Sequence, residues 1–470
     1  MEFNGSSPFP EGVISFLDTD LYKLTMQCAV LKYFSKVSVS YAFHNRTPEK
    51  KLSRAAFKWL QVQINKLGNI ALSADELRFL KSTCTYLNQP YLDFLQDFRL
   101  NPREQIEATF TPENDTGSDE DIGEFFLSIK GLWVDTILYE IPLLALTSEA
   151  YFRFMDTDWS YDGQEEKAYA KGMRLLEAGC VVSEFGTRRR RDYHTQALVF
   201  RGLVKAKKEG ERIGLPGKIS GTSNVHLAMR FGIPPIGTVA HEWFMGVAAI
   251  TGDYKNATTT ALSYWVGCFG EGVLGIALTD TFGTPVFLKA FSEPIKPVGD
   301  LEVGESITPD DSVNGNSKSK TFAEVFTGVR QDSGDPANFV KMMKEFYVSQ
   351  GITEKKTIVF SDSLNIDLCL EYKKISDEAG FNTSFGVGTF FTNDFVHLKT
   401  GAKSTPLNIV IKLSSAAGHS AIKISDNIGK NTGDQATVQK VKKDLGYVEK
   451  EWAQGDEAKR WGSDEVENSK

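Results

Sequence analysis

The sequence of 470 residues has few of the residues that build metal centres and disulfide frameworks: five cysteines and six histidines. The cysteines are widely scattered and never form a CxxC pair; they are Cys28, Cys84, Cys180, Cys268 and Cys369. This spacing excludes the common zinc-site patterns and predicts free thiols in a reducing compartment.

Long apolar runs are also missing. No uninterrupted apolar stretch approaches the ~20 residues that a membrane helix needs. The first residues lack the basic region and apolar core that are typical of a secretory signal. We therefore expect a cytoplasmic or nuclear protein with no membrane partner.

An excess of positive charge is absent as well. The formal net charge is −8, which argues against a general affinity for nucleic acid but allows local basic patches. The hydrophobic content of 41% is typical of a globular protein. A chain of this length exceeds one ordinary core, so we expect two packed units.

The two expected units differ in pattern. Residues 1–150 mix a predicted helix over 21–34, an alternating strand over 37–46 and an acidic loop over 111–124, which indicates an α+β unit. From residue 151 to residue 404, short apolar runs alternate with amphipathic helical stretches. The runs lie within 178–187, 214–223, 234–243, 272–283, 326–335, 357–363 and 382–389. This alternation predicts parallel βα units, and about seven of them can close or nearly close a β/α barrel.

Two polar segments interrupt this order. Residues 300–320 are acidic and then rich in Ser, Asn and Lys, so we expect a mobile surface insertion there. The tail from about Gly455 is also polar, and we expect it to fray.

The predicted strands end in polar residues, and the carboxyl ends of barrel strands share one face that carries the chemistry. One of these ends is followed by four arginines, Arg188 to Arg191. Such a run is usually a solvated face, but after a strand end its first one or two guanidinium groups would reach over the barrel mouth, where they suit phosphate or carboxylate.

A second candidate for anion binding is the sequence SFGVGTFF. Gly386 and Gly388 would let backbone N–H groups approach a phosphate, and Thr389 adds a hydroxyl. Glycine pairs often only make a turn. At the last strand of a barrel, however, this pair favours a phosphorylated substrate.

Carboxylates follow three other predicted strands, at Asp280, at Asp332 and Asp335, and at Asp362. They could simply cap helices, above all Asp335 before Pro336. They could also hold Mg²⁺ together with substrate phosphates, or stabilise positive charge that develops on a sugar ring.

His241, in IGTVAHEWFMG, is the histidine that raises the sharpest question. The zinc-protease motif HExxH fails because Met245 stands where the second histidine is needed. Without a cysteine cluster or a second nearby histidine, we do not expect a metal ligand. A structural imidazole, an acid/base group and a phosphate-accepting nucleophile all stay open at this point.

The chain resembles the nicotinate phosphoribosyltransferase family, most of all its fungal members. The motifs cover nearly the whole sequence; they are FLDTDLYKLTM, DTILYEIPLLAL, EFGTRRRR, GTSNVHLA, GTVAHEW, ALTDTFGT, GVRQDSGDP, FSDSLN, FGVGTFFTNDF and IKISDNIGKN. The resemblance implies a type II phosphoribosyltransferase fold, with an irregular β/α barrel beside an N-terminal α/β domain. It also implies that residues 405–470 rejoin residues 1–150.

For function, the resemblance implies that nicotinate and phosphoribosyl pyrophosphate (PRPP) give nicotinate mononucleotide and pyrophosphate in NAD salvage, coupled to ATP hydrolysis. The histidine of GTVAHEW is transiently phosphorylated in the family, which gives His241 that role. We also expect Asp280 and Glu184 to be catalytic. The matching contacts of nicotinate are Tyr22, Thr238 and Arg330, and we expect Arg330 or Arg188 to neutralise its carboxylate.

The expected PRPP-binding residues come from the later strand ends. They are Thr389, Gly388, Gly386, Ser333, Asp332 and Asp362. Mg²⁺ would be held through substrate phosphates, with its protein ligand unassigned. The expected partners are these small molecules and ATP, with no nucleic acid, and the resemblance allows a homodimer.

Two alternatives to this function remain. A related enzyme acting on nicotinamide would share the fold and the PRPP site, but its pocket should lack a cation aimed at a carboxylate. A non-catalytic barrel protein that senses PRPP or ATP would have no need for a phosphorylatable histidine.

Overall fold

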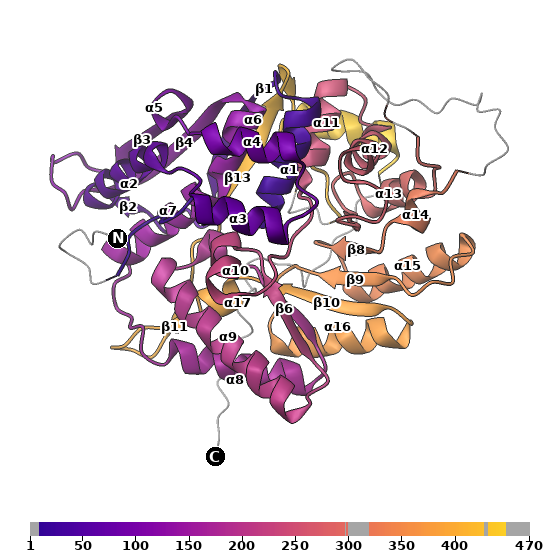
Figure 1. Ribbon diagram of the computed structural model, residues 1–470. Helices are drawn as coiled ribbons and strands as arrows, with labels where there is room; N and C mark the ends of the chain where they lie inside the picture. The colour runs from indigo at the N-terminus through magenta and orange to yellow at the C-terminus, as the bar shows by residue number, and fades with distance from the viewer. Residues whose placement is uncertain (1–8, 297, 299–318, 427–430, 448–470) are drawn as a thin grey trace.

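The computed structural model describes residues 9–296, 298, 319–426 and 431–447, and contains two large sheets surrounded by helices (Figure 1). The predicted insertion at 300–320 lies outside the described residues except for its last two positions, and the predicted tail from Gly455 lies outside them entirely. Within the described residues, no helix is both long and apolar enough to cross a membrane.

The first sheet is antiparallel and combines early and late parts of the chain. Its order is β14-β13-β1-β4-β2, with β3 paired to β4. The strands are β1 (Ser38–Asn45), β2 (Leu52–Ser53), β3 (Ile106–Pro112), β4 (Ile122–Leu132), β13 (Ile409–Ala416) and β14 (His419–Ser420). In Figure 1, β13 runs among the strands and helices of the first 150 residues. The late segment therefore completes the early sheet through the β1–β13 ladder.

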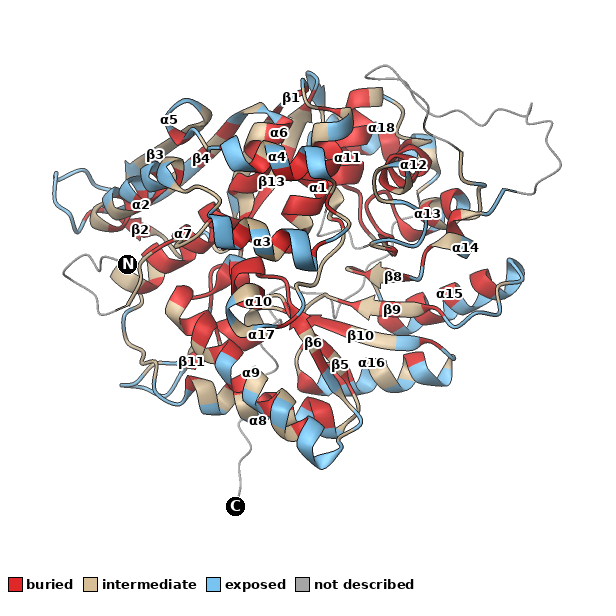
Figure 2. Cartoon of the chain, viewed as in Figure 1, coloured by how far each residue is buried: buried red, intermediate tan, exposed pale blue. Residues whose placement is uncertain are grey.

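Helices of the early part pack around this sheet and against helices of the later chain. They are α1 (Leu21–Tyr33), α2 (Arg54–Lys66), α3 (Ala74–Thr83), α4 (Gln89–Asp97), α5 (Pro102–Gln105), α6 (Trp133–Thr136) and α7 (Glu140–Phe154). Most residues of α1 and α7 are buried (Figure 2), so these two helices pass through the interior. Since α7 continues through residue 150, the boundaries at 150 and 404 stay predictions.

The second sheet is fully parallel, in the order β6-β5-β10-β9-β8-β7. Its strands are β5 (Val181–Glu184), β6 (Lys218–Thr222), β7 (Ile276–Leu278), β8 (Gly328–Gln331), β9 (Thr357–Phe360) and β10 (Asn382–Val387). Each of the six lies within a predicted apolar run. The mixed α/β class and its parallel βα units are therefore confirmed.

Helices alternate with these strands, as the pattern predicts. They are α8 (Gln164–Glu177), α9 (Tyr193–Ile213), α10 (Val225–Phe231), α11 (His241–Thr251), α12 (Ala257–Phe269), α13 (Thr284–Phe291), α14 (Phe322–Val325), α15 (Pro336–Ser349), α16 (Ile366–Glu378) and α17 (Thr389–Thr392). The hairpin of β11 (Phe395–Val396) and β12 (Lys403–Ser404) and the helix α18 (Gln435–Leu445) complete the described α-helices and strands.

The one other predicted strand, within 234–243, is wrong. Pro234 and Pro235 have no N–H to donate to a ladder, and the segment forms only one isolated bridge, between Pro235 and Thr222. It still contacts both edges of the parallel sheet. The N–H of Ile236 donates to Thr222 O at 2.8 Å, and Thr238 Oγ1 donates to Ile276 O at 3.2 Å.

This segment therefore spans from β6 to β7 without a strand ladder. Its extended part ends at Ala240, the N-cap of α11, so His241 is the first residue of a helix. The extended approach ends at the carboxyl side of the parallel sheet, which is where the histidine is placed.

Candidate active site

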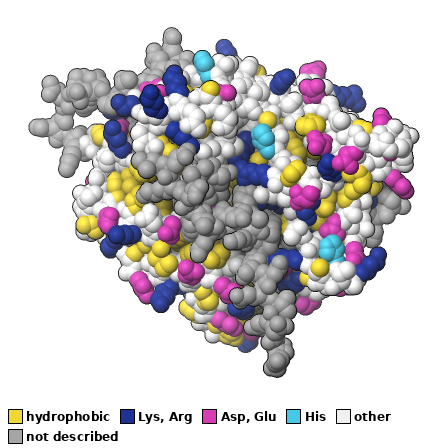
Figure 3. Space-filling view, turned by 180° about the vertical axis from the view of Figure 1, so that it is seen from behind, with side chains coloured by type: hydrophobic (Ala, Val, Ile, Leu, Met, Phe, Trp, Pro, Cys, Tyr) yellow, Lys and Arg dark blue, Asp and Glu magenta, His cyan; other side chains and the backbone are white. Residues whose placement is uncertain are grey.

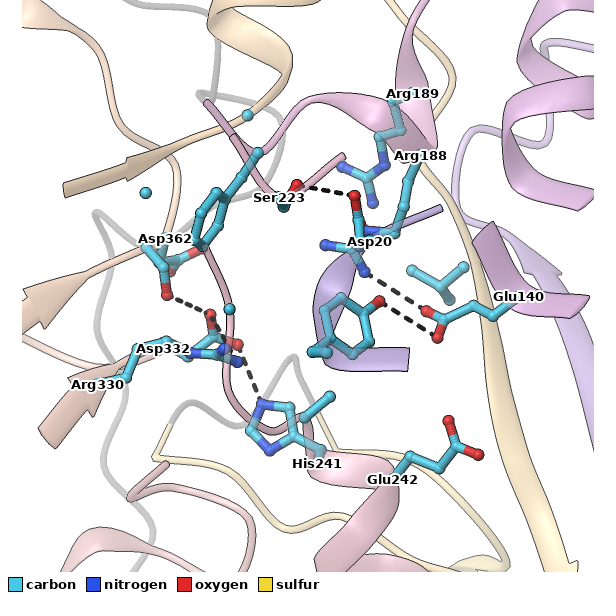
Figure 4. A pocket seen from close by; sticks show the side chains of 18 of the residues that line it. Asp20, Glu140, Arg188, Arg189, Ser223, His241, Glu242, Arg330, Asp332 and Asp362 are labelled. Atoms are coloured by element: carbon cyan, nitrogen blue, oxygen red, sulfur yellow. Dashed lines mark hydrogen bonds and ion pairs between the residues drawn. The ribbon is translucent and has the colours of Figure 1, made fainter. Parts of the chain in front are cut away.

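A pocket opens at the carboxyl ends of β5, β8, β9 and β10, between the two sheets. The start of α1, the start of α11 and the inner face of β13 complete its walls. Ten of the predicted site residues line it: Tyr22, Arg188, Thr238, His241, Arg330, Asp332, Asp362, Gly386, Gly388 and Thr389. The other three, Glu184, Asp280 and Ser333, lie behind the wall. The topology thus gathers side chains from segments far apart in the sequence (Figure 4).

His241 is held on both sides of its ring. Nδ1 lies 2.9 Å from Thr281 Oγ1. Nε2 lies 3.0 Å from Asp332 Oδ2 and 2.8 Å from Lys423 Nζ. Burial, with Lys423 adding to it, lowers the pKa of His241 to about 4, so the ring is neutral near pH 7.

The two contacts at Nε2 make opposite demands. Asp332 needs a proton on this nitrogen, whereas the ammonium group of Lys423 needs a lone pair there. A neutral ring can meet one demand at a time, and the hydroxyl of Thr281 can donate or accept to match either tautomer. In each tautomer one ring nitrogen keeps a lone pair, which is the requirement for a nucleophile or a base.

Two aspartates next to His241 stay ionised. Burial alone would raise the pKa of Asp332, but Arg330 and His241 lower it well below the ordinary value. Burial opposes ionisation at Asp280 too, yet Lys423 and His241 lower its pKa to about 2. Asp280 Oδ1 is buried without a hydrogen bond and lies 3.7 Å from His241 Nε2.

Sequence reasoning did not assign Lys423, although the motif IKISDNIGKN contains it. Lys423 Nζ lies 3.3 Å from Asp280 Oδ2, and its side chain is 5% exposed. The residue follows no strand of the parallel sheet, so the rule that places chemistry at βα strand ends could not find it. Its position between two apolar residues, Ile422 and Ile424, was the available sign of a buried cation.

Among the described residues, His241, Asp280 and Asp332 form one group whose ligand atoms are close enough to share a metal ion. The ammonium group of Lys423 contacts both His241 Nε2 and Asp280, so it supplies positive charge where such an ion would lie. A cation bound by protein side chains alone would have to displace it.

The first two of the four arginines lie in a different part of the molecule from the last two. Arg188 and Arg189 line the pocket. Arg190 is 1% exposed and pairs with both oxygens of Asp18 at 2.7 Å. Arg191 is buried too, with its guanidinium group over the rings of Phe152 and Phe395. The expectation that only the first one or two reach the mouth is confirmed.

One face of the molecule carries charges of both signs. On the face seen in Figure 3, Lys and Arg side chains alternate with Asp and Glu side chains. The run from Arg188 to Arg191, which could have suggested a nucleic-acid site, lies in the pocket and in the core.

The glycine-rich turn after β10 lies at the pocket. A different neighbouring group explains the absence of a side chain at each of its two glycines. A Cβ at Gly386 would meet the Phe185 ring at 2.7 Å, so close packing explains this glycine. Gly388 faces the Phe185 carbonyl oxygen, 3.0 Å from where its Cβ would be. Thr389 follows at the start of the short helix α17.

The opposite wall holds the residues expected to contact nicotinate. Tyr22 OH donates to Glu140 Oε2 at 3.4 Å, and Arg188 Nη1 lies 3.6 Å from Glu140 Oε1. Arg330 Nη1 donates to Val239 O at 3.2 Å, while its buried Nε has no hydrogen bond. Two guanidinium groups thus face one cavity, Arg188 from the turn after β5 and Arg330 from β8.

Glu184 and Ser333 support the wall from behind. Glu184 accepts hydrogen bonds from Thr222 Oγ1 at 2.6 Å and from Gln196 Nε2 at 3.1 Å, and burial raises its pKa to about 7. Ser333 Oγ donates to Asp280 Oδ2 at 2.5 Å. Asp335 caps α15 by accepting from Ala337 N, as its position before Pro336 predicts.

Several polar residues of the pocket were missed besides Lys423. Ser361 Oγ donates to Asp332 Oδ1 at 2.8 Å, and Ser223 Oγ donates to Asp20 Oδ1 at 2.7 Å. Glu140 sits in a motif whose apolar pattern predicts only a buried helix. Its role depends on long-range contacts that local periodicity does not contain.

Comparison with known proteins gives a consistent result. The family model "Nicotinate phosphoribosyltransferase (NAPRTase) family" matches residues 180–449, and the model of the N-terminal domain of the same family matches residues 17–148. A probable nicotinate phosphoribosyltransferase of Schizosaccharomyces pombe is 45% identical over 92% of this chain and 98% of its own length. The nicotinate phosphoribosyltransferase of Saccharomyces cerevisiae is 42% identical over 95% of this chain and 98% of its own length.

Solved structures agree with the sequence matches. The crystal structure of a putative nicotinate phosphoribosyltransferase from Saccharomyces cerevisiae superposes with a TM-score of 0.84 at 41% identity, covering 94% of this chain and 100% of that one. A nicotinate phosphoribosyltransferase structure from Porphyromonas gingivalis gives a TM-score of 0.77 at 32% identity, covering 92% and 100%. The similarity therefore extends over both sheets.

Proposed function

Since this chain belongs to the nicotinate phosphoribosyltransferase family and is a transferase of NAD biosynthesis, we propose that its pocket couples nicotinate mononucleotide synthesis to ATP hydrolysis through His241. Nicotinate and PRPP are the substrates, and pyrophosphate leaves. The family relationship also favours an enzyme over a non-catalytic sensor of PRPP or ATP.

Arg188 and Arg330 neutralise the carboxylate of nicotinate in this proposal. Both line the pocket, and a guanidinium group can bind a carboxylate through two N–H donors. Tyr22 offers a stacking surface to the pyridine ring, and Thr238 closes the same wall. The nicotinamide alternative fits less well, because a neutral amide gains little from two cations. Competition between both pyridines for turnover decides this point.

PRPP lies toward the strand ends on the other side. Thr389, Gly388 and Gly386 line that wall together with Asp332 and Asp362, while Ser333 fixes Asp280 from behind. Positive charge builds up on the ribose as pyrophosphate departs, and carboxylates near the ring lower that barrier. We assign this electrostatic role to the pocket carboxylates.

Mg²⁺ fits this wall as an ion held mainly by substrate phosphates. Asp332 and Asp362 present carboxylate oxygens to the pocket, which are the ligands that Mg²⁺ prefers. When bound, the ion would offset the charge of the departing pyrophosphate.

The single observation that carries the role of His241 is its neutral ring between Lys423 and Asp332. A ring nitrogen with a lone pair attacks the γ-phosphorus of ATP, the bond to the β–γ bridging oxygen breaks, and ADP leaves. The ammonium group of Lys423 lies where it can offset charge on the transferred phosphoryl group. Water then releases phosphate from the histidine and restores the free ring.

Incubation with nicotinate, PRPP, Mg²⁺ and ATP labelled at the γ position tests the proposal. We expect nicotinate mononucleotide, ADP and an acid-labile phosphohistidine. His241→Ala should abolish ATP hydrolysis and labelling while it leaves slow transfer at high PRPP. Undiminished ATP hydrolysis in this variant would sink the assignment of His241.

Three further expectations stay predictions from the sequence: a homodimer, a cytoplasmic location and a nuclear one. Sedimentation of the purified chain with and without substrates tests the first. Fluorescent tagging in cells tests the other two.

A further inference from the structure

We propose that Glu140 is a positioning residue that orients Arg188 and the Tyr22 hydroxyl, and thereby determines how tightly the pocket holds the carboxylate of nicotinate. This inference rests on the proposed function, because it assigns a specificity role within the same pocket. Glu140 acts through its neighbours, since its carboxylate contacts the side chains of Lys23, Arg188 and Tyr22.

The carboxylate of Glu140 divides its two oxygens between two sets of partners. Oε1 faces Arg188 Nη1 at 3.6 Å. Oε2 accepts from Lys23 Nζ at 2.6 Å and from Tyr22 OH at 3.4 Å. Figure 4 shows Arg188 pointing toward the carboxylate of Glu140, which lies at the side of the cavity. One group therefore sets the direction of two ligand-facing side chains.

A buried lysine fixes Glu140 itself. The side chain of Lys23 is fully buried and forms a second ion pair with Glu242. Glu242 also accepts hydrogen bonds from Tyr41 OH at 2.6 Å and from Trp133 Nε1 at 2.8 Å. Because Lys23 is held by a second, fully bonded carboxylate, it anchors Glu140 Oε2 in one place. Oε1 is then left pointing at Arg188.

The N–H donors of Arg188, and not a net positive charge, make this arrangement suit an anionic ligand. Lys23 and Arg188 carry two positive charges, and Glu140 and Glu242 carry two negative ones, so the group is neutral before a ligand binds. A guanidinium group has five N–H donors, and the contact at Nη1 leaves others to face a carboxylate. Arg188 is 45% exposed, so a ligand in the pocket can reach them.

Two effects compete when Glu140 loses its charge, and their signs differ. Removing a negative charge near the pocket would by itself help an anion to bind. Losing the anchor would let Arg188 move among its rotamers, which weakens a geometric contact. Our proposal holds that the second effect wins.

The test is a double-mutant cycle on Glu140→Gln and Arg188→Met, read as the KM of nicotinate and as its Kd by calorimetry. We expect each single variant to raise both constants about 10-fold, which corresponds to about 1.4 kcal/mol, while kcat and the KM of PRPP change by less than about 3-fold. The double variant should be no worse than the poorer single variant, because Glu140 acts through Arg188.

Glu242→Gln is the matched control. It removes a carboxylate from the same lysine but has no contact with Arg188, so it should lower thermal stability and raise the nicotinate constants less than Glu140→Gln does. If Glu140→Gln does not fold, Glu140→Asp carries the test. This variant keeps the charge but shortens the reach toward Arg188, and the nicotinate Kd must rise.

Additive losses in the cycle, tighter nicotinate binding by Glu140→Gln, or an equal change in the KM of PRPP would overturn the inference. The binding arm also separates it from the proposed function. A wild-type chain that binds nicotinate but forms no nicotinate mononucleotide contradicts the function and still decides the cycle. A wild-type chain that does not bind nicotinate overturns both.

Discussion

His241 and Glu242 are consecutive residues at the start of α11, yet they belong to two different groups of buried charges. His241 joins Asp280, Asp332 and Lys423 in what we call the histidine cluster. Glu242 joins Lys23 and Glu140 in the lysine cluster. Figure 4 shows the two side chains pointing apart, so one helix start serves both.

The two clusters differ in how their polar atoms are satisfied. In the lysine cluster, each carboxylate accepts from at least two donors. In the histidine cluster, Nε2 faces a donor and an acceptor at once, and Asp280 Oδ1 has no hydrogen bond. A buried network in which every donor and acceptor is paired stabilises the fold. Polar atoms that compete for a partner, or have none, can instead bind a proton or a ligand. We infer that the first cluster supports the wall and the second carries the reaction.

The largest effect is expected when Lys23, the central residue of the lysine cluster, is removed. Lys23→Met leaves two buried carboxylates facing each other, so we expect a loss of about 3–5 kcal/mol in the free energy of unfolding. Urea denaturation of the purified variant at pH 7.5 measures this loss. The double variant Lys23→Met with Glu242→Gln should recover part of it. A change below about 1 kcal/mol would contradict the structural role.

Removing Lys423 should lower the rate of the reaction rather than the stability of the fold. Lys423→Met removes the cation beside His241, and we expect ATP-dependent labelling of His241 to fall about 100-fold to 1000-fold. Lys423→Arg keeps the charge and should retain more labelling than the methionine variant. The measurement is the rate of phosphohistidine formation from labelled ATP. Unchanged labelling with reduced stability would place Lys423 with the supporting residues instead.

Much of the fold was predictable because local patterns determine it. The apolar runs around β5 to β10 and the amphipathic stretch of α9 have the periods of their elements, and six of the seven predicted parallel strands are present. The failure at 234–243 has a local cause. Two prolines remove ladder donors, and the apolar residues that follow them fill the space between β6 and β7.

The site was predictable where chemistry follows a strand end. Ten residues expected there do line one pocket, since carboxyl ends of parallel strands share an edge. Lys423 and Glu140 escaped because neither follows a strand of the parallel sheet. Their roles depend on contacts across long sequence separations, which no periodicity records.

A third test uses pH to check the lowered pKa of His241. The folded pKa of His241, about 4, lies below the ordinary value of 6.5, so the unfolded chain binds more protons between these pH values. Stability from this group is therefore present above pH 6.5 and is lost as the pH falls toward 4, by up to about 3 kcal/mol. Subtracting the unfolding curves of His241→Asn from those of the wild-type chain at pH 7.5, 5.5 and 4.5 isolates it. A difference that does not vary with pH would contradict the lowered pKa.

The smallest effect is expected at Glu184, which lies outside the histidine cluster. Glu184, expected from the sequence to be catalytic, lies behind the wall, and its oxygens are engaged by Thr222, Gln196 and the Gly186 N–H. Because Glu184→Gln keeps the shape of a side chain that is fully buried, we expect kcat for nicotinate mononucleotide to change less than about 3-fold at pH 7.5. Asp280→Asn is the contrasting variant, since Asp280 lies 3.7 Å from His241 Nε2 and contacts Lys423, and its loss should be larger. A loss near 100-fold for Glu184→Gln, with the fold intact, would move Glu184 into the reacting set and extend the histidine cluster to β5.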